Sequence, residues 1–163
     1  MKKIYDIIKK LYYLFRPMEH YIPENEVNLH NQIVQASFNT YLPLTSQGFQ
    51  VTPNPLAKNK TSVGGLNKVY PDIVVWRPNQ GAVNKGTAVV SEVIETPGSV
   101  NYNRELWRKL GSINSMEFTL IVPSEQATNV KNIIQTENIG VKRLQTYIPN
   151  SNGTVSFYDI PLE

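Results

Sequence analysis

The sequence predicts a single α/β domain with a central mixed sheet of about five to six strands, flanked by helices. The 163 residues match the usual length of one domain, and 40% of them are apolar, which is enough to form a hydrophobic core. Short apolar runs typical of strands alternate along the chain with apolar residues at helical spacing. We therefore expect one domain over residues 1–163, with an N-terminal helical extension (1–22) and a core (23–163).

The first predicted element is a basic amphipathic helix in the N-terminal extension. Its apolar residues fall at helical spacing: Ile4, Ile7, Ile8, Leu11, Tyr12 and Phe15. Lysines surround them, and Pro17 follows shortly after. We expect this helix to dock on the core or on a second copy in a homodimer, with a membrane-surface anchor or a nucleic-acid arm as alternatives. Its apolar run is too short for a transmembrane segment and lacks a cleavage site, so we expect a cytoplasmic protein.

The first half of the core reads as one helix followed by three strands. The helix starts near Pro23 and Glu24, carries a buried stripe that includes His30, and should stop at Pro43. Strands follow over residues 49–52, 68–76 and 87–96, with a polar loop at 53–67 and a turn at 78–81. The apolar run over residues 73–76 is typical of a strand that is covered on both faces.

The second half of the core predicts two more helices and three strands. A helix over residues 103–113 precedes a buried strand over 118–122, and a further helix begins at Ser124 and ends before Gly140. Two final strands, 141–148 and 154–160, are joined by a turn at 150–153. The expected order of the core is therefore α-β-β-β-α-β-α-β-β.

Composition excludes several classes of site. The chain has no cysteine, which rules out disulfides, thiolate zinc sites and cysteine nucleophiles. The phosphate-binding loop, the serine elbow and the His-Glu-x-x-His zinc helix are also missing from the sequence. A net charge of +3 is compatible with a polyanionic partner but does not indicate one by itself.

Two acidic residues in the predicted sheet point to a metal site. Asp72 follows Pro71 at the start of a buried strand, and Glu92 lies within the next strand among valines. Burying such a carboxylate is costly unless something binds it. Because phosphodiester hydrolysis needs converging carboxylates to hold Mg²⁺ or Mn²⁺, pairing of the two strands could bring Asp72 and Glu92 around one ion.

With Pro71-Asp72 followed by the run Ser91 to Thr96, the chain resembles the PD-(D/E)XK nuclease superfamily over roughly residues 24 to 123. This superfamily includes many restriction endonucleases and Holliday junction resolvases. The resemblance implies a restriction-endonuclease-like core and a Mg²⁺- or Mn²⁺-dependent DNA endonuclease. It also implies that Asp72 and Glu92 bind the metal, and that Glu26, on the preceding helix, is the position that best matches a further metal ligand.

The sequence departs from the motif where a lysine should orient the attacking water, because Ile94 stands two residues after Glu92. Glu95 could join Glu92 across a one-residue bulge, since in a regular strand it points to the other face. Alternatively, Glu95 occupies the lysine position and Val93 the acid position. In a third arrangement, Lys109 or Arg108, from the following helix, supplies the cation.

Basic residues are candidates for contacts with the DNA backbone. They are Lys58, Lys60, Lys68, Arg104 and Arg108. The chain has two histidines, His20 and His30, and His20 lies on a segment whose structure the sequence does not indicate. No metal triad can be assembled from them, so we expect core or surface histidines. The alternative to an active nuclease is a degenerate module with the same fold that binds nucleic acid or a protein partner.

Overall fold

The computed structural model describes residues 18–57, 60–64, 68–78 and 87–163. The helix expected over residues 4–15, the turn at 79–81 and Lys58 lie outside these described residues. No helix in the described ranges is long and apolar enough to cross a membrane.

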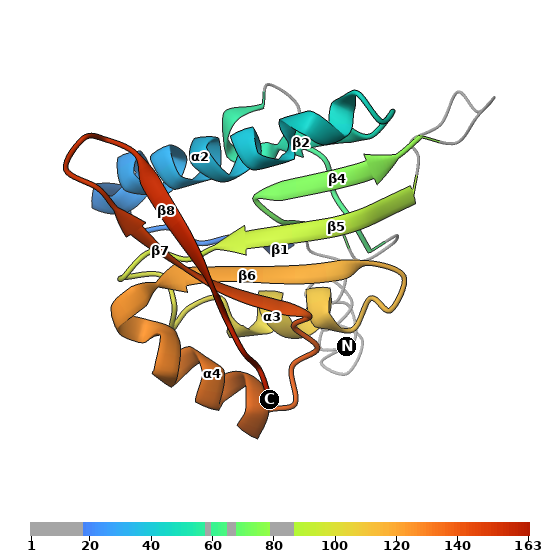
Figure 1. Cartoon of the computed structure of the whole chain (residues 1–163). Coiled ribbons are helices and arrows are strands. Elements are labelled where there is room, and N and C mark those ends of the chain that lie inside the picture. Colours follow the sequence, from blue (N-terminus) through green and yellow to red (C-terminus); the bar gives the residue numbers. More distant parts are fainter. Residues whose placement is uncertain (1–17, 58–59, 65–67, 79–86) are drawn as a thin grey trace, which may run out of the picture.

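A mixed sheet of six strands forms the centre of the molecule (Figure 1). Its spatial order is β2 (Gln50–Pro53), β4 (Ile73–Arg77), β5 (Thr87–Ile94), β6 (Glu117–Pro123), β7 (Arg143–Pro149) and β8 (Val155–Ile160). The strands β5, β6 and β7 run parallel, while β2, β4 and β8 pair antiparallel with their neighbours. The predicted α/β class with a mixed sheet is therefore confirmed, as is the terminal hairpin, whose turn is closed by a hydrogen bond from Asn150 N–H to Thr154 O.

The helices cover opposite faces of the sheet (Figure 1). Helix α2 (Val27–Thr45) packs on one face, where Ile33 and Val34 join Ile73, Ile94 and Ile121 in an apolar cluster. Helices α3 (Arg104–Gly111) and α4 (Ala127–Thr136) pack on the other face over the larger part of the core. Short 3₁₀ turns, η1 (Glu24–Glu26), η2 (Asn54–Leu56) and η3 (Ser124–Gln126), complete the fold.

Helix α2 continues past the proline that we expected to end it. Pro43 lies inside the helix, which ends at Thr45. A proline removes the hydrogen bond to the carbonyl four residues earlier, which here belongs to the exposed residue Asn39. Water can hydrate that carbonyl, so the last turn persists.

The strand expected over residues 68–76 is two strands. Val69–Tyr70 forms β3, which pairs in parallel with β1 (Met18–Glu19) in a separate small sheet, and the main-sheet strand β4 starts only at Ile73. Pro71, which has no N–H to donate, stands at the break. The break matters for function because it turns Asp72 inward and brings the segment after β1 alongside it.

Candidate metal centre

Asp72 is held by the backbone of β5. Its N–H donates to the carbonyl of Glu92 (2.8 Å), and its Oδ2 accepts a hydrogen bond from the N–H of Ile94 (2.7 Å). Only 2% of the residue is exposed. The carboxylate is thus fixed at the point where the chain enters the main sheet.

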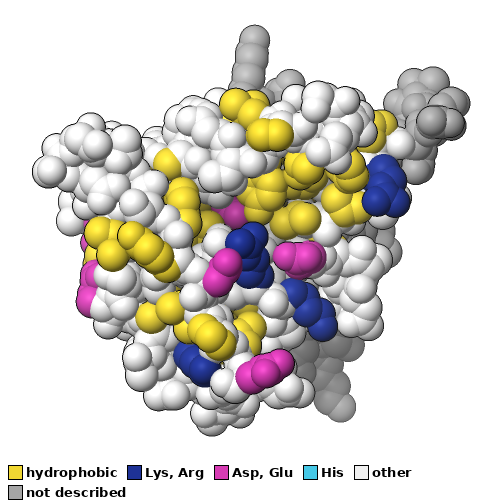
Figure 2. Space-filling model, in the orientation of Figure 1, with side chains coloured by type: hydrophobic (Ala, Val, Ile, Leu, Met, Phe, Trp, Pro, Cys, Tyr) yellow, Lys and Arg dark blue, Asp and Glu magenta, His cyan; other side chains and the backbone are white. Residues whose placement is uncertain are grey.

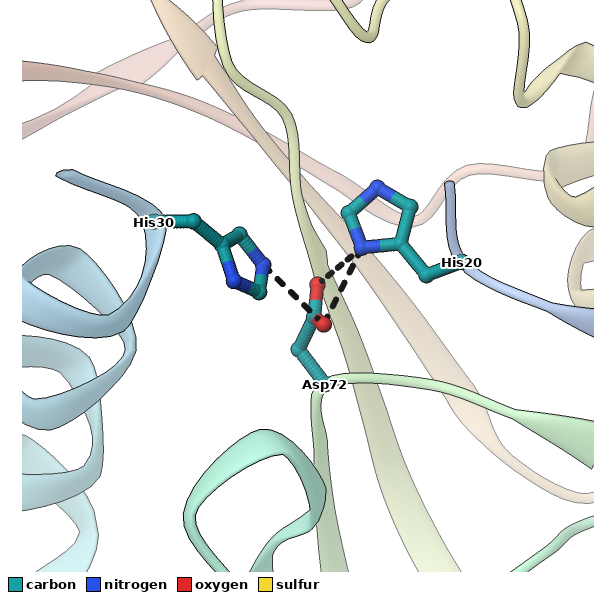
Figure 3. Close-up of side chains that lie close together, drawn as sticks. All are labelled: His20, His30 and Asp72. Atoms are coloured by element: carbon teal, nitrogen blue, oxygen red, sulfur yellow. Dashed lines mark hydrogen bonds and ion pairs between the residues drawn. The ribbon is translucent and has the colours of Figure 1, made fainter. Parts of the chain in front are cut away.

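Two histidines surround this carboxylate (Figure 3). His20, which follows β1, places Nδ1 3.0 Å from Oδ1 and 2.9 Å from Oδ2 of Asp72. His30, in the first turns of α2, places Nε2 3.1 Å from Oδ1. The segment after β1 and the start of α2 therefore meet at a carboxyl group that comes from much later in the sequence.

The cluster is strongly polarised. Burial by itself lowers the pKa of His20, but the negative charges of Asp72 and Glu95 outweigh it and raise that pKa to about 10. Burial likewise works against the ionised form of Asp72, yet the two imidazoles hold its pKa well below the ordinary range. Without a bound ion, the centre is a buried pair of charged His20 and ionised Asp72.

Glu95 joins the centre through His20. Its Oε2 lies 3.1 Å from His20 Nε2 and accepts hydrogen bonds from Asn103 Nδ2 (2.9 Å) and from the Ser99 hydroxyl. The indole N–H of Trp107 donates to Oε1 (2.7 Å). Glu95 is fully buried, so these donors fix its orientation.

Glu92 faces the opposite side of the sheet. Its register partner on β4 is Ile73, which packs with Ile33 and Val34 of α2, whereas Asp72 precedes the strand. The Glu92 carboxyl accepts hydrogen bonds from Ser37 and from Tyr41 (2.8 Å), both on α2. Burial raises the pKa of Glu92 to about 7, although these hydroxyl donors lower it.

The directions of Glu92, Val93 and Glu95 distinguish among the arrangements that could replace the missing lysine. Residues 90–94 pair with β6 in unbroken register, so no bulge brings Glu95 to the side of Glu92. Val93 is in the core on the side of α3, where Glu95 also meets Trp107. Glu95 and Val93 therefore point to one side of the sheet and Glu92 to the other. This matches the arrangement in which Glu95 takes the lysine position of the motif and Val93 the acid position.

The remaining predicted ligand and the cation on α3 lie apart from this cluster. Both carboxylate oxygens of Glu26 accept a hydrogen bond from the N–H of Gly98 (3.1 and 3.0 Å), which ties η1 to the turn after β5. Lys109 is partly buried on α3, and no ion pair to it is found among the described residues.

Most of the predicted DNA-contacting residues are distributed over the surface. Arg104 and Arg108 pair with Glu137, at 3.4 and 2.5 Å, and Arg108 also pairs with Glu105. Lys68 is exposed next to β3, while Lys60 pairs with Glu19 at 3.3 Å. Of this group, Lys60 is the one that reaches the metal centre, because it lines the same pocket as Asp72.

An open pocket of about 210 Å³ gives access to the cluster. His20, His30 and Asp72 line it, together with Glu19, Asn31, Lys60 and Tyr70. One ligand atom from each of His20, His30 and Asp72 lies within 4.8 Å of the other two, a spacing that can hold a metal ion. The pocket has room for such an ion and several waters.

His30 is buried, as expected of a core histidine, but the sequence did not indicate that His20 and His30 meet at Asp72. The sequence did carry a signal for His30, which interrupts the buried apolar stripe of α2 and is 3% exposed. His20 gave no such signal, because it follows a strand of only two residues.

Comparison with known proteins gives no significant match, whether to a family model, to a curated protein or to a solved structure.

Proposed function

We propose that this chain is a metal-dependent phosphodiesterase that cleaves DNA, related to the PD-(D/E)XK nucleases that the motif around Asp72 resembles. One observation carries the proposal: His20, His30 and Asp72 place three ligand atoms within 4.8 Å of one another in a pocket open to solvent. Buried histidines and carboxylates gathered at a pocket are typical of hydrolytic metal centres.

The residues present fit a divalent ion. The Nε2 atoms of His20 and His30 are buried, and neither has a partner in hydrogen-bonding geometry. The Nε2 of His30 faces Asp72, and an orphaned nitrogen in that place is expected where a ligand completes the site. A divalent ion held there supplies an activated water and neutralises charge that develops on the phosphate.

Residues of the chain position the ion and can contact the substrate. Asp72, fixed by the Ile94 N–H, gives the ion an anionic ligand in a defined position. Lys60, on the same pocket wall, carries a positive charge that can approach a phosphate of the substrate. The order of strands and helices also supports a restriction-endonuclease-like fold, because a β4–β5 antiparallel pair leads into the parallel strands β6 and β7.

Cleavage assays with Asp72→Asn and Glu92→Gln test this proposal. Supercoiled, linear and single-stranded DNA are incubated with the full chain and Mg²⁺, Mn²⁺ or Zn²⁺. We expect Asp72→Asn to lose at least 100-fold of the cleavage rate while circular dichroism shows a folded protein. Glu92→Gln, on the other face of the sheet, should retain the rate. Loss in both variants supports the ligand pair that the motif implies, and no cleavage by the wild type contradicts the enzyme proposal.

The second candidate is a non-catalytic module that binds nucleic acid or a protein. The observation that favours it is the lack of an ion pair between any described lysine and the carboxylates of Asp72, Glu92 or Glu95. A wild type that binds DNA equally well with and without metal, and cuts none, supports this module.

A further inference from the structure

We infer that the centre takes a borderline transition-metal ion of the Zn²⁺ type in preference to Mg²⁺, with Glu95 as the residue that orients His20. This inference deepens the proposed function, because it names the ion that the same site binds. It rests on the ligand atoms themselves and on a second observation, the unpartnered Nε2 of the buried His30, which lies 3.1 Å from Asp72 Oδ1.

The donor set favours nitrogen-binding metals. Two of the three ligand atoms are imidazole nitrogens, from His20 and His30, and the third is a carboxylate oxygen of Asp72. Imidazole suits Zn²⁺ and its neighbours, whereas Mg²⁺ prefers oxygen ligands and keeps several waters. Three protein ligands with an open side also match the pattern of a catalytic zinc site, in which water takes the fourth position.

The state without an ion leaves polar atoms in need of a partner. The side chains of His20 and His30 are 5% and 4% exposed, so bulk water cannot solvate their rings fully. The Nε2 atoms lie 3.1 Å from carboxylate oxygens of Glu95 and Asp72, respectively, yet neither contact has hydrogen-bonding geometry. Each ring thus has one buried nitrogen that lacks a hydrogen bond, while Nδ1 of His20 is bonded to Asp72.

Glu95 is placed to act on the metal through His20. The Nδ1 atom of His20 faces Asp72 and the Nε2 atom faces Glu95, so the ring lies between the two carboxylates. The 3.1 Å contact between Nε2 and Glu95 lacks hydrogen-bonding geometry, but ligation through Nδ1 would let the ring turn so that Nε2–H donates to Glu95. Such a carboxylate partner commonly fixes the tautomer and the orientation of a ligating histidine. Trp107 and Asn103 hold Glu95 in that position.

The charges support a dication as well. Asp72 and Glu95 bring two buried carboxylates to the cluster, while Lys60, the nearby lysine of the pocket, is half-exposed and pairs with Glu19. A doubly charged ion with neutral imidazole ligands matches these two carboxylates in charge. Buried acidic groups need this kind of compensation.

Binding measurements on the full chain, after treatment with a chelator, test the inference. Calorimetry with Zn²⁺, Mn²⁺ and Mg²⁺ should give a Kd for Zn²⁺ at least 100-fold below that for Mg²⁺. His30→Gln and His20→Asn should each weaken Zn²⁺ binding by at least 100-fold. Equal or tighter binding of Mg²⁺, or unchanged Zn²⁺ affinity in both variants, overturns the inference.

The role of Glu95 is tested with a matched pair of variants. Glu95→Gln should weaken Zn²⁺ binding by about 10- to 100-fold, and Glu92→Gln, three residues earlier on the same strand, should leave it unchanged. Co²⁺ serves as a spectroscopic probe, because its visible absorption reports on the ligand geometry. We expect the Co²⁺ spectrum to change in Glu95→Gln and not in Glu92→Gln. Identical spectra in wild type and Glu95→Gln contradict the orienting role, whatever the variant does to stability.

The outcomes separate this inference from the proposed function. Tight Zn²⁺ binding that depends on His20 and His30, with no cleavage of DNA, upholds the metal site and contradicts the nuclease. Cleavage supported by Mg²⁺ in a protein that does not bind Zn²⁺ through these histidines upholds the nuclease and contradicts the Zn²⁺ site.

Discussion

Glu92 and Glu95 lie three residues apart at the end of the same strand, and both are buried, yet their surroundings differ in kind. Glu92 faces α2 and receives hydrogen bonds from two hydroxyls, those of Ser37 and Tyr41. Glu95 faces α3 and meets an imidazole of the metal centre as well as amide and indole donors. The odd spacing between them places one acid on each side of the sheet.

The surroundings also change the pKa values of the buried acids. Glu92 keeps its proton up to nearly neutral pH, whereas Asp72, in the candidate metal centre, is ionised. The pKa of Glu92 is raised to about 7 by burial, whereas that of Asp72 is held low by His20 and His30. Figure 2 shows a surface on which hydrophobic side chains gather and no histidine is visible among the described residues, as expected for side chains as buried as those of His20 and His30. A buried carboxylate is thus a functional candidate here only where cationic or metal-binding groups contact it, as the two histidines contact Asp72.

Among the substitutions that test this difference between the two acids, we expect Glu92→Gln to change the free energy of unfolding most. A folded-state pKa of about 7 against an ordinary value of 4.5 means that ionisation of Glu92 costs the folded state roughly 3 kcal/mol. Glutamine keeps the shape and stays neutral, so above pH 7 the variant should be more stable than the wild type by about that amount. Chemical unfolding between pH 4 and pH 8 measures the difference.

The sign of the Glu92 effect follows from linkage. Below pH 4.5 the carboxyl is neutral in both the folded and the unfolded state, so the two proteins should differ little. As the pH rises to about 7, the unfolded state loses this proton first, and the wild type loses stability relative to Glu92→Gln. A difference that stays constant with pH contradicts a proton held at Glu92.

A smaller effect, of about 1 to 3 kcal/mol, is expected from Trp107→Phe. The change removes the indole N–H that donates to Glu95 Oε1 and leaves a buried carboxylate oxygen without that partner. The matched change on the other face, Tyr41→Phe, removes a hydroxyl donor from Glu92, which remains largely protonated at pH 6. Unfolding at pH 6 should therefore show the larger loss for Trp107→Phe, and equal losses contradict the difference between the two acids.

The sequence predicted the elements of the fold because periodicity is a local property. The apolar run over residues 73–76 and the helical stripe that contains Ile33 and Val34 correspond to β4 and α2. Alternation also predicted that Glu92 and Glu95 point to opposite faces. Local patterns could not predict which helix covers which face, because that depends on contacts between distant segments.

The composition of the metal centre was less predictable for the same reason. Asp72 was identified by its place after Pro71 at the start of a buried strand. His20 reaches Asp72 only because β1 pairs with β3, in a sheet of two-residue strands that leave no pattern in sequence. Lys60 reaches the pocket through a polar loop whose path the sequence does not specify. Non-local pairing therefore decides which side chains surround a carboxylate that the sequence can identify.

The smallest effect is expected at the surface of the Glu92 face, where Arg143 pairs with Asp159 at 2.7 Å. Their side chains are 46% and 61% exposed, so solvent screens the pair, and Arg143→Gln should cost less than about 1 kcal/mol. Arg143 also lowers the pKa of Glu92 slightly through space. Without it, the folded-state pKa of Glu92 should rise, because burial then acts on the carboxylate with less compensation. The stability difference between Glu92→Gln and its parent, which opens near the ordinary pKa of 4.5 in either background, should therefore level off at a higher pH and at a larger value. Unfolding curves of Arg143→Gln with and without Glu92→Gln measure this shift, and a difference that levels off at lower pH contradicts the through-space effect of Arg143 on the Glu92 pKa.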